Sequence, residues 1–232
     1  FWGLSTTAYV NYRFMNCFGE KIVENKNGKL TFTAGSERFM NAVDKLYSYN
    51  DPTLGEVLNA YNSDYEVERG GFIYVFTIER SLFLTAEICK TQGFRNLDFT
   101  YGIVPFPKYD ENQENYVTTI YQEALAFSIP TTCKTPEDTA IIFDALAYEG
   151  RKSLVPAYRE NSVEQKGLRN EDSIEMLGII ADGAYNDIGS MYGLLGNFIT
   201  DLYKDISDRS GTMASIIAKY KVSITEAIDA LK

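Results

Sequence analysis

Histidine is absent from the chain, and its absence excludes several kinds of catalysis. Without an imidazole there can be no Ser-His-Asp or Cys-His nucleophile, no histidine-ligated zinc and no imidazole proton shuttle. Cysteine is scarce as well, because Cys17, Cys89 and Cys133 lie far apart and form no CxxC pair. Three thiols allow at most one disulfide, and we expect all three side chains to be small, buried apolar residues. The sequence therefore predicts neither a metal site nor a cofactor.

Positive charge is in the minority, with 22 Lys and Arg against 32 Asp and Glu, and the net charge is −10. This balance argues against nucleic acid or an anionic membrane surface as a partner, since neither would attract the chain. No apolar run approaches the roughly 20 residues that span a bilayer. The sequence begins at Phe1, without a methionine, a basic leader or a lipid-modified cysteine. We therefore expect a processed product or fragment, whose association with a membrane would depend on an upstream lipid anchor.

Apolar residues make up 45% of the chain, and their spacing predicts strands that alternate with helices. Asn27-Gly28 is a turn signal at the centre of a hairpin over residues 22–33. Ser36 is a helix N-cap, and Thr135-Pro136 with the two acids that follow begins a helix that reaches residue 148. The remaining expected elements are a helix over 54–61, a strand over 72–78, a helix over 79–90, a strand over 118–129, a helix from 171, helices over 190–208 and 213–220, and a last helix that begins with a capping box at 223–226.

Residues 72–78 give the clearest strand signal, because they form a continuous run of apolar, aromatic or β-branched side chains. A strand without alternation has both faces covered, as in an open α/β sheet between helices. Ligands of such sheets bind at the carboxyl ends of strands, which makes Glu79 and Arg80 candidate ligand contacts. Their carboxylate and guanidinium suit sugar hydroxyls or charged solutes. The alternative is an ion pair between the two side chains at the start of a helix.

Aromatic side chains are a second group of candidate ligand contacts. Trp2 is the only tryptophan, and its indole face could stack on a pyranose ring, with Tyr9 close by in the sequence. The alternative for Trp2 is a place in the core. Adjacent acids such as Glu171 and Asp172 point to different faces of a helix, so their spacing does not form the carboxylate pair of a glycosidase. No catalytic residue is predicted.

The most distinctive motif runs from Tyr101 to Gln113 and reads YGIVPFPKYDENQ. Its two prolines predict a stiff, extended strap that leaves a strand and cannot continue a ladder. The motif resembles the signature of bacterial extracellular solute-binding proteins of the maltose-binding-protein-like type, which are the receptors of ABC importers. Further motifs keep the order of this family along almost the whole chain: Ser36–Phe39, Ile129–Thr131, Ala145–Glu149, Val155–Tyr158, Glu175–Leu177, Tyr185–Gly189 and Thr225–Ile228.

The resemblance implies a periplasmic-binding-protein-like fold of type II, in which two α/β lobes joined by hinge strands enclose the ligand. The C-terminal lobe would have a mixed sheet flanked by helices and a helical tail, and most of the N-terminal lobe would be absent. The stretch from the N-terminal lobe would then lack its sheet neighbours, so we expect it to pack irregularly, to move or to pair with another molecule. The implied ranges are 1–100 for the first part of the C-terminal lobe, 101–107 for a hinge that contains Tyr101, Pro105 and Pro107, 108–148 for a segment of the N-terminal lobe, and 149–232 for the helical part of the C-terminal lobe.

By the same resemblance, Tyr185, Asp187 and Tyr192 lie opposite the ligand, although Asp187 could equally cap the helix that follows it. The implied function is that of a receptor fragment, not an enzyme, which captures a small solute, preferably a carbohydrate, and delivers it to ABC permease subunits. Its location would be extracellular, as a cell-surface lipoprotein, or periplasmic. The alternatives are a carbohydrate-active enzyme that uses Asp and Glu, and a sensory or adhesive surface domain. Peptides and polyols are alternative solutes.

Overall fold

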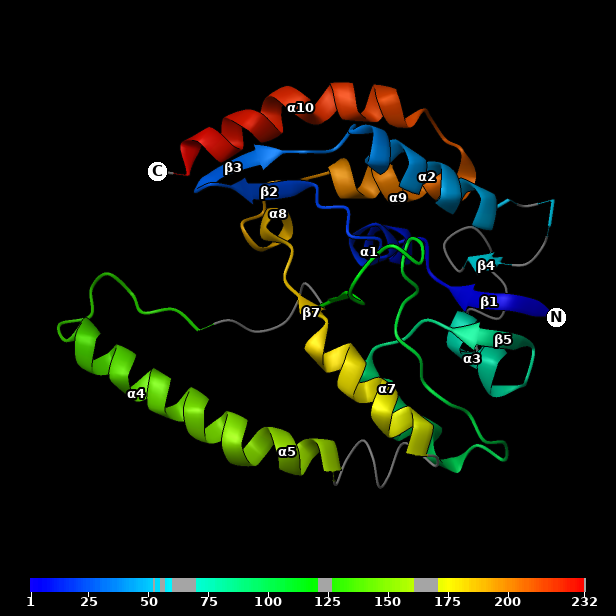
Figure 1. The fold of residues 1–232 in the computed structure, drawn as a ribbon, viewed down its shortest axis with the longest axis horizontal. Helices are drawn as coiled ribbons and strands as arrows, with labels where there is room; N and C mark the ends of the chain where they lie inside the picture. Colours follow the sequence, from blue (N-terminus) through cyan, green and yellow to red (C-terminus); the bar gives the residue numbers. More distant parts are fainter. Residues whose placement is uncertain (52, 55–56, 60–69, 121–126, 161–170, 232) are drawn as a thin grey trace. The chain divides into compact units, whose positions relative to one another are not determined.

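The computed structural model (Figure 1) describes residues 1–51, 53–54, 57–59, 70–120, 127–160 and 171–231, and it shows an α/β protein with small sheets and many helices. Its residue contacts divide the chain into two units. The first unit comprises Phe1–Ala86, Val104–Gln122 and Met176–Lys232, and the second comprises Glu87–Ile103 and Glu123–Glu175.

The first unit contains a parallel sheet whose strand order is β4-β1-β5. Its strands are β1 (Trp2–Thr6), β4 (Val57–Asn59) and β5 (Ser81–Leu84). In the central strand, Leu4 is in register with Val57 on one side and Phe83 on the other. Helix α3 (Gly71–Thr77) contacts both β1 and β5, as a crossover between parallel strands does.

The strand predicted over residues 72–78 is wrong, because these residues form α3, and the helix predicted over 79–90 is replaced by β5 and a 3₁₀ helix, Ile88–Asn96. The helix predicted over 54–61 is also wrong where residues are described, since Val57–Asn59 is β4. Aromatic and β-branched residues favour strands only where a pleated, half-buried surface accepts them. In α3 only Gly71 and Val75, one helical turn apart, are buried, so a single narrow face meets the sheet.

The predicted hairpin is confirmed as β2 (Val23–Lys26) and β3 (Lys29–Phe32), which pair antiparallel. Both turn residues, Asn27 and Gly28, have positive φ values of 55° and 84°, as the tight turns of two-residue hairpins require. Helix α2 (Glu37–Tyr49) begins where predicted, and the Phe39 N–H donates to Ser36 Oγ over 3.1 Å. These elements are set by local signals that act within a few residues.

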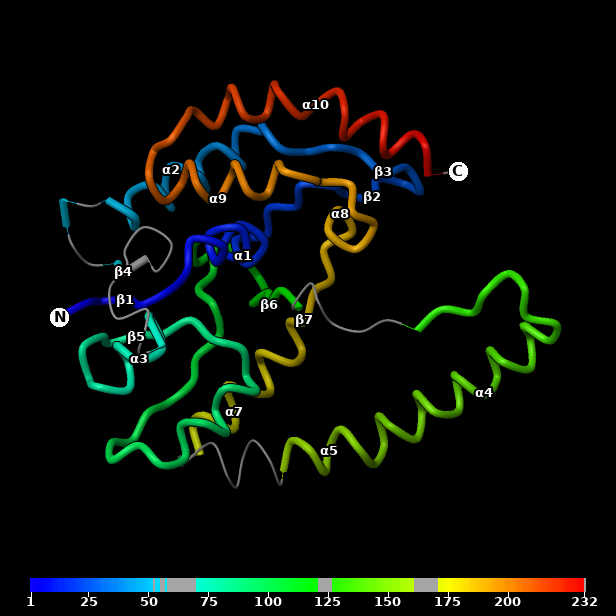
Figure 2. Tube along the Cα trace, turned by 180° about the vertical axis from the view of Figure 1, so that it is seen from behind, coloured from blue at the N-terminus to red at the C-terminus, as the bar shows by residue number. Residues whose placement is uncertain are grey.

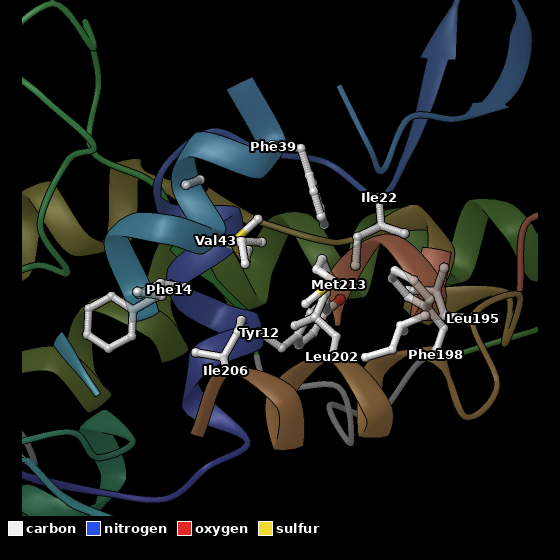
Figure 3. Packing of buried hydrophobic residues seen from close by; sticks show 14 of the residues in the cluster. Tyr12, Phe14, Ile22, Phe39, Val43, Leu195, Phe198, Leu202, Ile206 and Met213 are labelled. Atoms are coloured by element: carbon white, nitrogen blue, oxygen red, sulfur yellow. The ribbon is translucent and has the colours of Figure 1, made fainter. Parts of the chain in front are cut away.

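The core of the first unit lies between helices α1 (Val10–Cys17), α2, α9 (Phe198–Asp208) and α10 (Met213–Ala230). Figures 1 and 2 both show α10 running along β3 and α9, which it contacts. Figure 3 shows buried side chains from these helices converging, with Phe198 at one end. The Phe198 ring meets Phe32 and Tyr220 edge to face at centroid distances of 5.7 and 5.8 Å. Such packing fixes α1 and the segments that rest on it.

Two predicted boundaries among the C-terminal helices are wrong. The helix expected over 190–208 is divided into α8 (Ile188–Met191) and α9, and the loop between them contains Gly193 and Gly196 with positive φ. Conversely, α10 continues through residues 220–226, where a new helix was expected to begin. Ser223 Oγ donates to the Tyr220 carbonyl inside the helix instead of capping a new one.

The second unit contains the 3₁₀ helix and the run formed by α4 (Pro136–Glu149), a π-helical turn (Gly150–Leu154) and α5 (Val155–Tyr158). The start of α4 at the Thr135-Pro136 pair is confirmed, although Thr135 makes no side-chain capping bond. Helix α7 (Glu171–Asp182) begins at the predicted position, and its residues up to Glu175 belong to this unit and the rest to the first. The strand predicted over 118–129 is limited to β6 (Thr118–Thr119) among its described residues, and residues 121–126 lie outside them.

The boundary between the units falls between Ile103 and Val104, inside the strap. Before it, the Tyr101 hydroxyl donates to the Thr91 carbonyl over 3.3 Å and the Ile103 N–H donates to Ser173 Oγ over 3.0 Å, both within the second unit. After it, Phe106 packs edge to face against Phe14 at 4.9 Å in the first unit. The hinge role of Tyr101, Pro105 and Pro107 stays a prediction.

The prediction that all three cysteines are buried is wrong. Cys17 is buried, Cys133 is partly exposed and Cys89 is exposed, and each is a free thiol. Cys89 belongs to the 3₁₀ helix, which buries only Thr91 and Phe94. In the parts of the chain that the structure describes, no helix is both long enough and apolar enough to cross a bilayer.

Candidate functional site

The candidate site lies in the first unit, where a short parallel sheet meets α1. Strand β6 pairs with β7 (Ala184–Tyr185), and Thr119 is in register with Tyr185. Gly183 makes this pairing possible, because its carbonyl accepts the Thr118 N–H at 2.8 Å and an added Cβ would lie 2.6 Å from the Tyr116 carbonyl oxygen. Helix α1 contacts β6. The carboxyl ends of parallel strands share one edge, and Asp187 follows β7 at that edge.

Five side chains from these elements form what we call the polar cluster: Tyr12, Asn16, Thr119, Tyr185 and Asp187. Both polar atoms of the Asn16 amide, Thr119 Oγ1, Tyr185 Oη and Asp187 Oδ2 are buried, and none makes a well-aligned hydrogen bond with another described residue. Thr118 Oγ1 is also buried without a well-aligned hydrogen bond. Thr118 is not counted in the polar cluster, because neighbouring residues of a strand point to opposite faces. Buried polar atoms in folded proteins are nearly always hydrogen-bonded, so this concentration requires an explanation.

The groups that shift the pKa values connect Tyr12, Asn16, Tyr185 and Asp187, and the strand register places Thr119 beside Tyr185. Burial raises the pKa of Tyr12 most, and the charge of Asp187 raises it further. Hydrogen bonds to the side chains of Ser190 and Asn16 lower it in part. Burial and the same carboxylate raise the pKa of Tyr185. Burial raises the pKa of Cys17, the residue after Asn16, to about 12, against hydrogen bonding to Thr119. The two tyrosines are therefore neutral hydroxyls that can donate as well as accept.

Asp187 is the centre of charge in the polar cluster. Asp187 is only 4% exposed, and Oδ1 accepts the Ser190 N–H at 2.7 Å, so the alternative role of capping the following helix is confirmed. Ser190 Oγ in turn shares a 2.7 Å hydrogen bond with the Tyr12 hydroxyl. Burial raises the pKa of Asp187, and no cationic side chain is among the groups that shift it. Its second oxygen, Oδ2, makes no well-aligned hydrogen bond in the described part of the chain, although the Tyr12 side chain lies near enough to lower the pKa of Asp187.

Lys21 brings a cationic group to the margin of the polar cluster. Lys21 Nζ is 5.6 Å from the centre of the Tyr185 ring. Three of the five clustered side chains offer hydroxyls, one offers an amide and one a carboxylate. This set matches a neutral molecule with several hydroxyl groups, each of which donates one hydrogen bond and accepts others. Because no described residue forms an ion pair with the buried Asp187 carboxylate, an anionic ligand is disfavoured.

The structure brings Tyr185 and Asp187 together, as two of the seven predicted ligand contacts. Tyr192 follows α8 and is 62% exposed. Tyr9 is half-buried and packs edge to face against Tyr12 and Tyr203, at 5.8 and 5.6 Å. Tyr9 thus supports the Tyr12 ring from outside the polar cluster.

Trp2, Glu79 and Arg80 gather elsewhere in the first unit. The backbone N–H of Trp2 donates to the backbone carbonyl of Arg80 over 2.8 Å, and Trp2 is in register with Ser81 at the start of β5. Glu79 has a φ of 58° in the turn from α3 into β5. The strand-end argument for Glu79 and Arg80 is therefore wrong, because both precede a strand and lie at its amino end. Their role in ligand binding, like that of Trp2, stays a prediction.

Sequence reasoning missed Tyr12, Asn16 and Thr119 as site residues. Tyr12 and Asn16 are one helical turn apart on α1, a spacing that places them on the same face. Nothing in the sequence indicates that this face meets residues more than 100 positions away. Within the described residues, no group of three or more Cys, Asp or Glu side chains could hold a metal ion. No known protein family, curated protein or solved structure matches the chain.

Proposed function

We propose that this chain is part of an extracellular solute-binding receptor that captures a small, hydroxyl-rich solute, a carbohydrate in the first instance, for uptake by an ABC importer. The observation that carries the proposal is the polar cluster, in which five buried polar atoms of four residues make no well-aligned hydrogen bond with another described residue. The resemblance of Tyr101–Gln113 and the ordered motifs to solute-binding receptors supports the same conclusion. On this proposal the two units belong to a type II periplasmic-binding-protein-like fold.

A sugar would satisfy the polar cluster chemically. Its hydroxyls can donate to Asp187 Oδ2 while they accept from the Tyr185 hydroxyl or the Asn16 amide. Each bond formed removes the penalty of an unpartnered buried group, which is about 1–3 kcal/mol. A solute that lacks one of these hydroxyls leaves the corresponding group unpaired, so the same penalty provides specificity.

The proposed mechanism is non-covalent capture. The strap carries the chain from one unit to the other, and solute binding would shift an existing balance between open and closed arrangements towards the closed one. The closed form would then dock on the permease subunits, outside the cell or in the periplasm. Because the polar cluster contains one carboxylate, it does not supply the acid pair that most glycosidases use.

Thermal denaturation with a solute library tests this proposal. The library contains neutral mono- and disaccharides and polyols, with sugar acids and dipeptides as charged comparisons. A solute at one hundred times its dissociation constant stabilises a protein by about 2.7 kcal/mol, which raises the melting temperature of a chain of this size by roughly 5–10 °C. We expect a neutral carbohydrate to produce this shift.

Two variants show whether the shift comes from the polar cluster. Asp187→Asn should abolish the response, because it replaces the unpartnered oxygen and its charge. The matched control is Asp205→Asn, since Asp205 is also buried but accepts hydrogen bonds from Tyr47 and from the Gly211 N–H. No response to any solute, or equal responses in both variants, would contradict the proposal.

A further inference from the structure

The helical run 136–158 of the second unit has an unusual surface. Figure 1 shows α4 and α5 as one continuous helix, and no residue of α4, the π-helical turn or α5 is buried. Ile141 and Leu154 are 67% and 69% exposed. The other large apolar side chains that are exposed along the run are Ile142, Leu146, Tyr148, Val155 and Tyr158. A helix with this composition is normally covered by protein.

Apolar side chains surround α4 on several sides. Ile141, Ile142 and Phe143 are consecutive, so they point in three directions about 100° apart. Phe143 has a partner within the unit, since its ring lies 5.6 Å from Phe127. The opposite face carries Ile141, Asp144 and Tyr148 at spacings of three and four. Side chains on this face border a shallow, open groove of about 470 Å³, and the lining residues are Ile141, Asp144, Ala145, Ala147, Tyr148 and Arg151.

Charged side chains are ordered by sign along the run. Its four acids, Glu137, Asp138, Asp144 and Glu149, all come before its two bases, Arg151 and Lys152. A parallel copy of this helix would place like charges together. An antiparallel copy can place Asp144 opposite Arg151, and it also opposes the two helix dipoles.

We propose that a second copy of this chain covers the grooved face of α4, in an antiparallel helix pair with two-fold symmetry. The axis passes between Ala147 and Tyr148, because Asp144 and Arg151 are equally distant from that point along the helix. Each Asp144 then faces Arg151 of the other copy, and each Ile141 lies at the level of Leu154. The two charge pairs form by one symmetry operation, as in other isologous interfaces. The small side chains Ala145 and Ala147 allow the backbones to approach closely.

A charge exchange tests the pairing by sedimentation velocity on the full chain. The unchanged protein should form a dimer that dissociates on dilution. Asp144→Arg and Arg151→Asp alone should each weaken the dimer roughly tenfold. Each single substitution leaves positions 144 and 151 with the same charge, and these positions face each other at two symmetry-related places in the dimer. The double variant restores opposite charges and should recover the original dissociation constant. Both residues are exposed, so the fold should be unaffected, as circular dichroism would verify.

A cysteine substitution tests the two-fold axis. In a chain with Cys89→Ser and Cys133→Ser, Ala147→Cys lies next to the axis and should form an intermolecular disulfide under mild oxidation. Glu137→Cys lies at the end of the run and should not, because the partner's Glu137 is at the far end of the pair. A monomer at all concentrations, no recovery in the double charge variant, or equal cross-linking at both positions would overturn the inference. The solute-binding proposal rests on the first unit and is unaffected by these outcomes.

Discussion

The hydroxyl of Tyr185 provides a direct test of the polar cluster, because it is buried and has no hydrogen-bond partner among the described residues. Replacing Tyr185 by Phe removes that oxygen and keeps the ring. An unpartnered buried polar group costs about 1–3 kcal/mol, and since the rest of this side chain is half-buried we take the lower end. The free energy of unfolding should therefore rise by about 1 kcal/mol, which corresponds to roughly 2–4 °C in melting temperature for a chain of this size.

Tyr12→Phe is the matched control, since the same atom is removed from a neighbouring tyrosine that does have a partner. The Tyr12 hydroxyl shares a 2.7 Å hydrogen bond with Ser190 Oγ, and its loss leaves that oxygen unpaired. We expect Tyr12→Phe to lower the free energy of unfolding by about 1–2 kcal/mol. Urea denaturation followed by circular dichroism measures both changes, provided that the slope of the transition stays constant.

Solute binding should respond in the opposite sense to stability. Tyr185→Phe is expected to bind a solute found by the library screen more weakly, although the free protein becomes more stable. This combination is typical of a group that is kept for function at a cost in stability. If Tyr185→Phe lowers stability as much as Tyr12→Phe does, the Tyr185 hydroxyl has a partner in solution and the argument from unpartnered atoms fails.

Three further predictions concern the site and the core. Burial raises the pKa of Asp187, so the folded protein keeps the carboxyl proton to a higher pH than the unfolded chain, in which the pKa is about 4. The stability that this proton provides is fully present below that unfolded pKa and is lost as pH rises through the folded pKa. Urea midpoints should therefore decline over that range relative to those of Asp187→Asn, and parallel pH profiles would contradict this. Gly183→Ala should lower the free energy of unfolding by about 1–3 kcal/mol through overpacking, whereas Gly93→Ala, with nothing within 4 Å of its added Cβ, should not; equal melting temperatures would count against the close contact. Phe198→Ala should cost about 3–5 kcal/mol, and the exposed Phe1→Ala less than about 0.5, in urea titrations; similar costs would show that Phe198 is not a core residue.

Local signals allowed part of the fold to be predicted. Asn27-Gly28, Ser36 and Thr135-Pro136 act through backbone conformations and capping bonds that involve only neighbouring residues, and the elements around them were located correctly. The α/β class followed from the alternation of patterns. The strand predicted over 72–78 failed because its residues respond to tertiary surroundings, and Gly70-Gly71, both with positive φ, begin a helix there instead.

The site could be predicted only where one short segment supplied it. Tyr185 and Asp187 lie two positions apart, and both were named as ligand contacts through the resemblance; the structure places them in the same cluster. Asn16 and Thr119 come from segments about one hundred positions apart, and the pairing of β6 with β7 brings in a third segment. These residues converge because segments far apart in the sequence pack together. The residue pattern of any single short segment gives no information about such packing.

The pairing of β1 with later strands determines when the chain can fold during synthesis. Strand β1 is complete at Thr6, but its partner β5 ends only at Leu84, and α1 packs on α9, which begins at Phe198. On the ribosome, α2 can cover part of α1 early, but the part of α1 that packs on α9 stays uncovered until residues 198–208 have been made. Contacts of such long range also slow refolding from denaturant. We expect this protein to depend on chaperones that shield nascent chains.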